Sequence, residues 1–343
     1  MSIADFTREH IYKVAGESGF QRDTTEKVIR LYYVLKGMAE VPLLRNNLAL
    51  KGGTAINLAL FPLVRLSVDI DMDFTRSGKM EELLSVRKEI KETLFSLLQV
   101  QGYSPGPGGK ETHTLDQWNF TYSSTGGNND HIKIELNYGI RNHVLPVMER
   151  DVRLGIVSDS GIRIPVLHPC ELYATKINAL LERSAVRDLF DVYSLAKSSL
   201  FSRPEEKEML RKCIVFYQTV GVEGFPGKDI SLNGIKDISP AKIRSQLVPL
   251  LASGRKFFPM EEARRTVTEY LTSILCLSPE EKEYMEAFSN LCYKPELLFR
   301  ENAAILERIT DHPMALWKIQ QAQKEVPVIK AGPQSKMKKG RRL

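Results

Sequence analysis

The spacing of apolar residues divides the chain into stretches of two kinds. Apolar positions recur at helical spacing over residues 24–41 and again from about residue 80 to residue 101, which predicts an amphipathic helix in each stretch. The period falls to two in the segments LSVDIDMDF, LDQWNFTYSS and HIKIELNYGIR, and such alternation is typical of half-buried strands. From His168 onward the chain returns to helical spacing, apart from a glycine-rich loop near residues 220–234. The pattern therefore predicts an α+β protein.

Changes in this pattern also indicate where the parts of the chain begin and end. We expect an N-terminal helical segment over residues 1–44, a mixed α/β core over 45–165, a helical C-terminal domain over 166–329 and a flexible tail over 330–343. Within the core, GGNND predicts the turn of an antiparallel hairpin, whereas GYSPGPGGKE predicts a loop. The sequence shows no internal repeat.

The strand LSVDIDMDF carries acids at alternate positions. Residues two apart in a strand point to the same face, so Asp69, Asp71 and Asp73 project together while the apolar residues between them pack the other side. Adjacent unpaired carboxylates repel one another, and a divalent cation relieves that repulsion. Carboxylate oxygens suit Mg²⁺, which also bridges to substrate phosphates. A third acid on a neighbouring strand would complete a two-metal site, and Glu135 in the alternating segment IKIELNY is the candidate.

Two other interpretations of these acids must be compared with that one. The spacing D-x-D-x-D also begins a calcium-binding EF-hand loop, but Phe74 stands where that loop needs glycine and Met80 where it needs glutamate. A polar face on an exposed edge strand is the other interpretation, and one D-x-D motif alone would favour it. The residues upstream of the strand favour a metal site over such an exposed polar face.

A glycine pair, Gly52 and Gly53, precedes a predicted helix that begins near Thr54. Glycine lets backbone N–H groups approach a ligand, and a helix N-terminus favours anions. A tight turn explains GGT equally well, and no GK[ST] of a Walker loop follows. The glycine turn, the helix and the D-x-D strand together resemble the pattern of polymerase-β-like nucleotidyltransferases. In that superfamily the turn holds the NTP triphosphate, and three acids hold two metal ions.

A closer resemblance covers most of the chain, from about residue 47 to residue 320. The segments GGTAINLAL, RLSVDIDMDF and HPCELYATKINALLERSAVRDLFDVYSLAK are similar to the AbiEii/AbiGii nucleotidyltransferase toxins of type IV toxin–antitoxin and abortive-infection systems, and YKPELLF and HPMALWKI fit their C-terminal region. The resemblance implies a polymerase-β-like core with a mixed sheet, followed by a mostly α-helical domain. It also implies an enzyme in the cytoplasm that uses Mg²⁺ or Mn²⁺ to transfer NMP from an NTP to RNA, such as the 3′ end of a tRNA, and that has a cognate antitoxin.

The resemblance assigns roles to single residues. Nucleotide contacts are expected from the turn, the R-x-S before the acids, a helical lysine and two arginines, namely Gly52, Gly53, Thr54, Arg65, Ser67, Lys176, Arg183 and Arg187. The expected catalytic residues are Asp69, Asp71, Lys176, Asp188 and Asp191, and the expected metal ligands are Asp69, Asp71 and Glu135. Glu135 rests on the superfamily geometry, and the choice between Asp188 and Asp191 as the active-site acid stays open. Asp73 lies past the metal pair and is expected to be structural.

Two of these motifs also have simpler explanations. Lys176 lies beside the apolar stripe of the predicted helix 170–183, where a lysine is usually a surface residue whose aliphatic chain covers apolar groups. Arg187 and Asp191 are four residues apart, a spacing typical of an ordinary exposed ion pair on a helix. The functional interpretation of both motifs therefore depends mainly on the family resemblance.

Composition and charge narrow the choice of partners. With 43% hydrophobic and 26% charged residues the chain is globular, and it has no apolar run that predicts a membrane span or a signal peptide. The net charge of +6 lies in the tail, because the basic residues outside it equal the 42 acidic residues. A basic tail raises affinity for phosphate backbones, although it could equally be a solubilising end or an expression remnant. An RNA acceptor would then need a local basic patch. A protein or small-molecule acceptor and a non-catalytic RNA-binding module stay as alternatives.

The cysteines and histidines do not indicate a metal centre. No CxxC pair occurs, so we expect buried, reduced thiols rather than a zinc site at the four cysteines, Cys170, Cys213, Cys276 and Cys292. His168 and His312 each precede a proline at a predicted helix start, where capping or packing explains them best.

Overall fold

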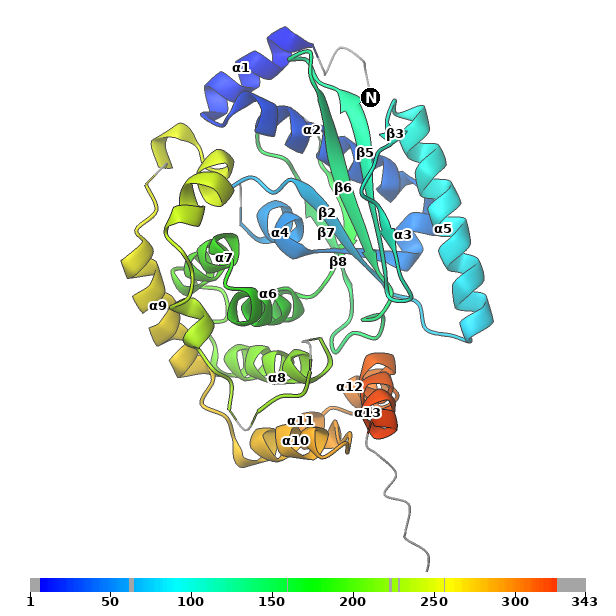
Figure 1. Ribbon diagram of the computed structural model, residues 1–343, viewed down its shortest axis with the longest axis vertical. Helices are drawn as coiled ribbons and strands as arrows, with labels where there is room; N and C mark the ends of the chain where they lie inside the picture. Colours follow the sequence, from blue (N-terminus) through cyan, green and yellow to red (C-terminus); the bar gives the residue numbers. More distant parts are fainter. Residues whose placement is uncertain are drawn as a thin grey trace, which may run out of the picture.

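The computed structural model describes residues 7–61, 65–158, 160–221, 224–227, 229–255 and 257–325. The predicted basic tail lies outside this range. The fold is α+β, with a mixed sheet in the first half and a bundle of helices in the second half (Figure 1). None of the described helices is long and apolar enough to span a membrane.

The sheet has eight strands in the order β3-β5-β6-β2-β1-β8-β7, and β4 pairs with β5. The bounds are β1 Leu48–Lys51, β2 Asp69–Phe74, β3 Ser104–Pro105, β4 Lys110–Glu111, β5 Leu115–Ser123, β6 Asn129–Asn137, β7 Met148–Val152 and β8 Ile162–Val166. The β2–β6 and β1–β8 pairs are parallel and the others are antiparallel, which confirms the expected mixed sheet. The predicted hairpin is formed by β5 and β6, whereas the expected loop also contains the short strands β3 and β4.

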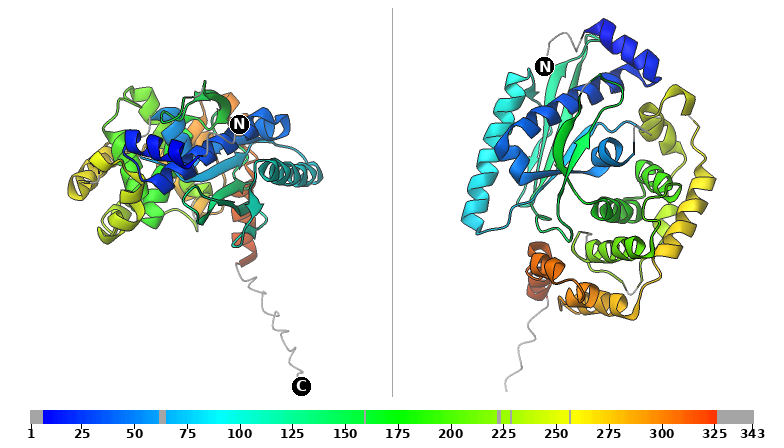
Figure 2. Two further views of the ribbon diagram at one scale, coloured as in Figure 1. Left: turned by 90° about the horizontal axis from the view of Figure 1, so that it is seen from above. Right: turned by 180° about the vertical axis from the view of Figure 1, so that it is seen from behind.

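Helices cover the sheet before the chain enters the helical domain. These are α1 Arg8–Ser18, α2 Arg22–Glu40, α3 Pro42–Asn47, α4 Gly52–Ala55 with a π-helical turn η2 Ile56–Leu60, and α5 Met80–Val100. Helix α2 crosses the back of the sheet (Figure 2), and its apolar face shares one hydrophobic core with the strands. The helices predicted over residues 24–41 and about 80–101 are thus present with nearly the expected ends, and the helix predicted near Thr54 begins two residues earlier, at Gly52.

The helical domain has its own hydrophobic core. Its helices are α6 Pro169–Arg183, α7 Val186–Ala196, α8 Pro204–Val220, α9 Met260–Ile274, α10 Pro279–Ser289, α11 Glu296–Phe299, α12 Ala303–Ile309 and α13 Pro313–Glu325, with short turns η3 Asn233–Ile235, η4 Ile243–Leu247, η5 Val248–Leu250 and η6 Ser253–Arg255. The side chain of His168 caps α6 by accepting from the Cys170 N–H, as expected. Cys170 and Cys213 are buried, but Cys276 and Cys292 are exposed near helix ends, so the expectation of four buried thiols was wrong.

Candidate active site

The glycine turn joins β1 to α4 and lies directly against the acids of β2. Gly52 has a φ of +69°, and a Cβ at this position would collide with the carboxylate of Asp71. A Cβ on Gly53 would lie 2.7 Å from Nη2 of Arg65 and 2.9 Å from Oγ of Ser67. Only glycine fits both positions without strain or displacement. The structure therefore brings the turn, the R-x-S segment and the D-x-D strand together.

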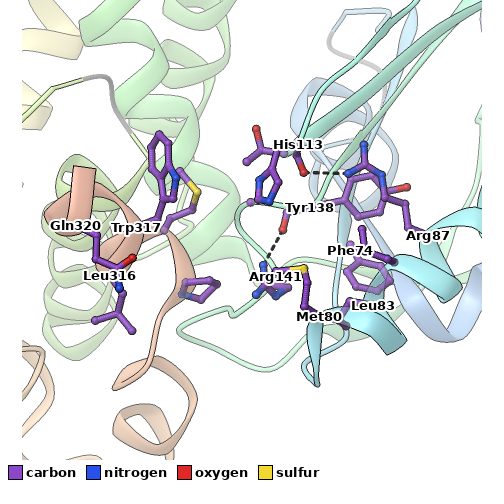
Figure 3. A pocket seen from close by; sticks show the side chains of 15 residues that line it. Phe74, Met80, Leu83, Arg87, His113, Tyr138, Arg141, Leu316, Trp317 and Gln320 are labelled. Carbon is purple, nitrogen blue, oxygen red and sulfur yellow. Dashed lines mark hydrogen bonds between the residues drawn. The ribbon is translucent and has the colours of Figure 1, made fainter. Parts of the chain in front are cut away.

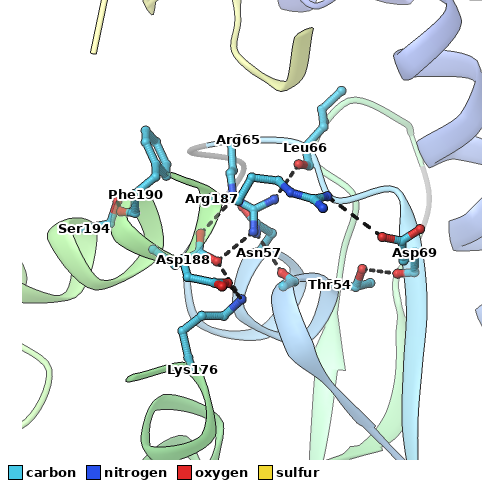
Figure 4. Close-up of polar contacts among 12 residues, drawn as sticks. Thr54, Asn57, Arg65, Leu66, Asp69, Lys176, Arg187, Asp188, Phe190 and Ser194 are labelled. Atoms are coloured by element: carbon cyan, nitrogen blue, oxygen red, sulfur yellow. Dashed lines mark hydrogen bonds and ion pairs between the residues drawn. The ribbon is translucent and has the colours of Figure 1, made fainter. Parts of the chain in front are cut away.

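Two hydrogen bonds tie the turn to β2 and to its own helix. The buried hydroxyl of Thr54 donates to the carbonyl oxygen of Asp69 over 2.5 Å, and Nδ2 of Asn57 donates to the Gly53 oxygen over 2.7 Å (Figure 4). Thr54 thus holds the backbone of the first acid in place. Its predicted role as a donor to a nucleotide would require that bond to be exchanged.

Glu135 lies next to Asp71 on the neighbouring strand. The parallel register of β2 and β6 pairs Asp71 with Glu135 and Asp69 with Lys133. Burial, followed by the negative charges of Glu135 and Asp69, raises the pKa of Asp71 to about 6. Lys133 forms an ion pair with Glu135, but this pair is half-exposed and does not neutralise the whole cluster. The acids on this face of the sheet therefore repel one another.

Asp73 shares this face but has a different environment. It is buried, and its carboxylate oxygens lie 2.6 Å from Nζ of Lys51 and 3.3 Å from Nε2 of His143. Burial raises the pKa of Asp73, but the positive charge of Lys51 and the hydrogen bond from His143 outweigh it and hold the pKa below its ordinary value. This paired carboxylate agrees with the expectation of a structural role.

A buried cluster of ion pairs connects α6 and α7 to the segment before β2. Arg65 donates to both carboxylate oxygens of Asp191 over 2.8 and 2.7 Å. Nζ of Lys176 lies 2.9 Å from Oδ1 of Asp188 and 3.1 Å from Oδ2 of Asp191. Arg183 donates to Asp188 over 2.7 and 3.0 Å from the rim of the cluster. Burial raises the pKa of Asp188, but Lys176 and Arg183 outweigh it and hold the pKa well below its ordinary value.

Both simpler explanations of the helical motifs are wrong. Lys176 is 8% exposed and contacts two carboxylates, so it is not a surface lysine. Asp191 pairs with Arg65, far away in the sequence, while Nη1 of Arg187 lies 3.9 Å from Oδ2 of Asp69. The local spacing of RDLFD suggested an ion pair within one helix, and no sequence signal linked Asp191 to Arg65. That contact exists because the sheet and the helical domain pack together.

The donor set fits a divalent cation, although the acids do not form a closed cage. Among the described residues, no three His, Cys, Asp or Glu side chains are grouped as in a preformed metal site. The carboxylate of Glu135 is drawn to Lys133 and that of Asp69 lies near Arg187. Even so, Asp69 and Asp71 present hard oxygen donors on one face. Burial, together with the charges of Glu135 and Asp69, raises the pKa of Asp71, and a cation bound here would favour its ionised form.

Known proteins share both this sequence pattern and this fold. The family described as nucleotidyl transferase AbiEii toxin, type IV TA system, matches residues 33–281, which include the turn, the acids and α7. No curated protein sequence matches the chain. Among solved structures, the nucleotidyltransferase toxin MenT4 from Mycobacterium tuberculosis H37Rv has a TM-score of 0.57 and 17% identity, covering 81% of this chain and 93% of that chain. At this identity the likeness to MenT4 concerns the fold alone.

Proposed function

This chain belongs to the AbiEii family of nucleotidyltransferase toxins of type IV toxin–antitoxin systems, and we propose that it transfers NMP from an NTP to an RNA acceptor. A hydroxyl of the acceptor would lose its proton and attack the α-phosphate, and pyrophosphate would leave. The acceptor that we infer is the 3′ end of a tRNA, and its modification would stop growth. An enzyme that acts on tRNA would work in the cytoplasm. The reaction would use Mg²⁺ or Mn²⁺. Membership of a type IV system implies a cognate antitoxin.

The observation that carries this proposal is the contact between the glycine turn and the acids. The carboxylate of Asp71 lies against the backbone of Gly52 and beside Glu135 on β6. A triphosphate held by the backbone N–H groups of the turn would therefore lie next to carboxylates. Two such anions approach each other only with a cation between them, and this is the arrangement of metal-dependent phosphoryl transfer.

The chain's own residues would hold and orient both substrates. Asp69 and Asp71 would hold the cation, with Glu135 as a further ligand. The bound cation would polarise the attacked phosphate and lower the pKa of the acceptor hydroxyl. The absence of side chains at Gly52 and Gly53 lets the phosphates approach the backbone. Positioning of this kind supplies most of the rate enhancement in phosphoryl transfer.

The buried ion cluster would fix the position of the glycine turn relative to the acids of β2. Three basic side chains, Arg65, Lys176 and Arg183, surround only two carboxylates, those of Asp188 and Asp191. The cluster thus retains positive charge beside the turn, which favours a bound triphosphate. We assign Asp191 a positioning role, because its partner Arg65 packs against Gly53. Asp188 would instead hold Lys176 inside the cluster and Arg183 at its rim.

A direct transfer assay tests this function. The full chain is incubated with Mg²⁺, total tRNA and each α-³²P-labelled NTP in turn. We expect label on tRNA. We also expect Asp71→Asn to lower the rate by more than about 100-fold, because mutation of a residue that only hydrogen-bonds to a metal ligand already lowers metal affinity or activity by about 10–100-fold. Asp151→Asn, an exposed acid on β7, is the matched control and should label like the wild type. Full activity of Asp71→Asn, or label on protein but never on RNA, would contradict the proposal.

A further inference from the structure

A polar cavity of about 480 Å³ opens beside the first acid of β2. Its walls come from segments far apart in the sequence, namely Val68 directly before β2, the end of α6, the start of α7 and the turns η4 and η5. The cavity therefore lies where the sheet meets the helical domain. Its volume is in the range of sites that take a small ligand or one nucleotide.

Basic side chains dominate the polar part of this wall: Arg183, Arg187 and Lys242. Lys242 is exposed and makes no ion pair among the residues that the structure describes. Within the described part of the chain, the ion pair of Arg187 is the one with Asp69, at 3.9 Å, and the side chain of Arg183 is 62% exposed although it donates to Asp188. The cavity thus carries more positive charge than its neighbouring carboxylates neutralise, and it should attract an anion.

The lining favours a phosphate over a nucleobase. Ser245 and Gln246 add a hydroxyl and an amide beside the basic groups, and the described residues that line the cavity include no aromatic side chain. Proteins that hold unpaired bases stack them on aromatic side chains, whereas Arg and Lys bind phosphate oxygens through charge-assisted hydrogen bonds. The chemistry of this cavity is therefore that of a phosphodiester site.

A second cavity, of about 310 Å³, shows the opposite character. It lies at the other end of β2, by Phe74, between α5 and α13, and its walls include Leu83 and Trp317 (Figure 3). Of the two arginines in its wall, Arg87 donates to both carboxylate oxygens of Asp116, and Arg141 donates to the backbone oxygen of Tyr138. This cavity is mainly apolar and far along the strand from Asp69, so it does not compete as a phosphate site beside the acids.

We propose that the polar cavity beside Asp69 binds the backbone phosphates of the acceptor strand next to its reacting end. The inference rests on the proposed RNA acceptor. The NTP phosphates are assigned to the glycine turn on the side of Asp71, whereas the cavity reaches the acids through Val68 and Arg187 on the side of Asp69. Outside the tail the chain has no excess of basic residues, so a local basic site is what an RNA acceptor requires.

Charge reversal at Lys242 tests this site. The variants are Lys242→Glu and Lys242→Arg, with Lys282→Glu on α10 as an exposed control that makes the same change in net charge. The KM for tRNA and the KM for NTP are measured separately. In parallel, binding of a 5′-labelled single-stranded oligoribonucleotide is titrated without NTP at several salt concentrations.

We expect Lys242→Glu to raise the KM for tRNA and the Kd for the oligonucleotide by about 5–10-fold and to lower the salt slope by about one unit, while the KM for NTP does not change. Lys242→Arg should behave like the wild type. Equal effects of Lys242→Glu and Lys282→Glu would overturn the site, and a raised KM for NTP alone would assign the cavity to the triphosphate instead. If the wild type labels no RNA, the proposed function fails, and the oligonucleotide titration still decides whether this cavity binds a phosphate backbone.

Discussion

Two groups of carboxylates meet at this site, and they differ in how their charge is balanced. Asp69, Asp71 and Glu135 lie side by side on strands, are partly exposed, and raise the pKa of Asp71 by mutual repulsion in addition to burial. Asp188 and Asp191 lie on α7, are buried, and are each held by two basic side chains. The charges of the helical group are balanced by its own ion pairs, whereas the strand group would be balanced by the cation proposed above.

This difference separates binding from positioning. A buried, fully paired carboxylate has no free oxygen to offer a ligand without breaking existing contacts, and breaking them is costly. Half-exposed acids that repel one another lose little and gain much when a cation arrives. We therefore expect substitutions in the strand group to affect activity far more than stability. Substitutions in the helical group should do the reverse.

The largest effect is expected where the strand group meets the turn. Gly52→Ala places a methyl group against the carboxylate of Asp71 at a φ of +69°. Displacement of the acid by about 1 Å would lower transfer by about 100-fold or more. Gly102→Ala is the matched control, because Gly102 has a φ of +84° but open space around its Cβ position. Both variants lose about 1–2 kcal/mol to backbone strain, and only Gly52→Ala should lose activity in the labelling assay. Equal activity of the two would show that the turn does not shape the site.

The strand group could be predicted from the sequence because its geometry is local. Alternation in β2 and in β6 put Asp71 and Glu135 on defined faces, and the short helical connection after the turn brought β1 back beside β2. The pairs Arg65–Asp191 and Lys176–Asp188 could not be predicted in the same way. Spacing along one helix favoured Arg187 as the partner of Asp191, but packing of α7 against the segment before β2 brought Arg65 closer. Exposure of Cys276 and Cys292 likewise depends on tertiary packing at helix ends.

Within the helical group, the two aspartates should differ in their effect on stability. Asp191→Asn leaves the buried guanidinium of Arg65 without a charged partner, which should cost about 3–5 kcal/mol of unfolding free energy. Asp188→Asn should cost less, about 1–3 kcal/mol, because Arg183 can turn to water and Lys176 retains Asp191. Urea unfolding of the two variants measures this difference. If Asp188→Asn proved the more damaging, Asp191 would not be the residue that anchors the turn through Arg65.

The smallest effect, and the one that compares the two groups most directly, is the sign of their pH dependence. The pKa of Asp71 is raised from 3.8 to about 6, so between these values the folded chain binds more protons than the unfolded chain. Asp71 therefore contributes about 1–3 kcal/mol to the free energy of unfolding below pH 4, and this contribution is lost as the pH rises through about 6. The pKa of Asp188 is lowered from its ordinary value of 3.8. Asp188 therefore stabilises the folded chain above pH 3.8, and this stabilisation is lost as the pH falls further.

Thermal unfolding in EDTA from pH 3 to pH 8 tests both signs. The unfolding temperature of Asp71→Asn should rise relative to that of the wild type as the pH rises. That of Asp188→Asn should be below the wild type near neutral pH and should approach it as the pH falls. Added Mg²⁺ should stabilise the wild type at pH 8 but not Asp71→Asn, because a ligand stabilises only the folded state that binds it. The same sign for both variants would mean that the strand acids are paired like the helical ones, and the argument for a cation between them and the triphosphate would lose its basis.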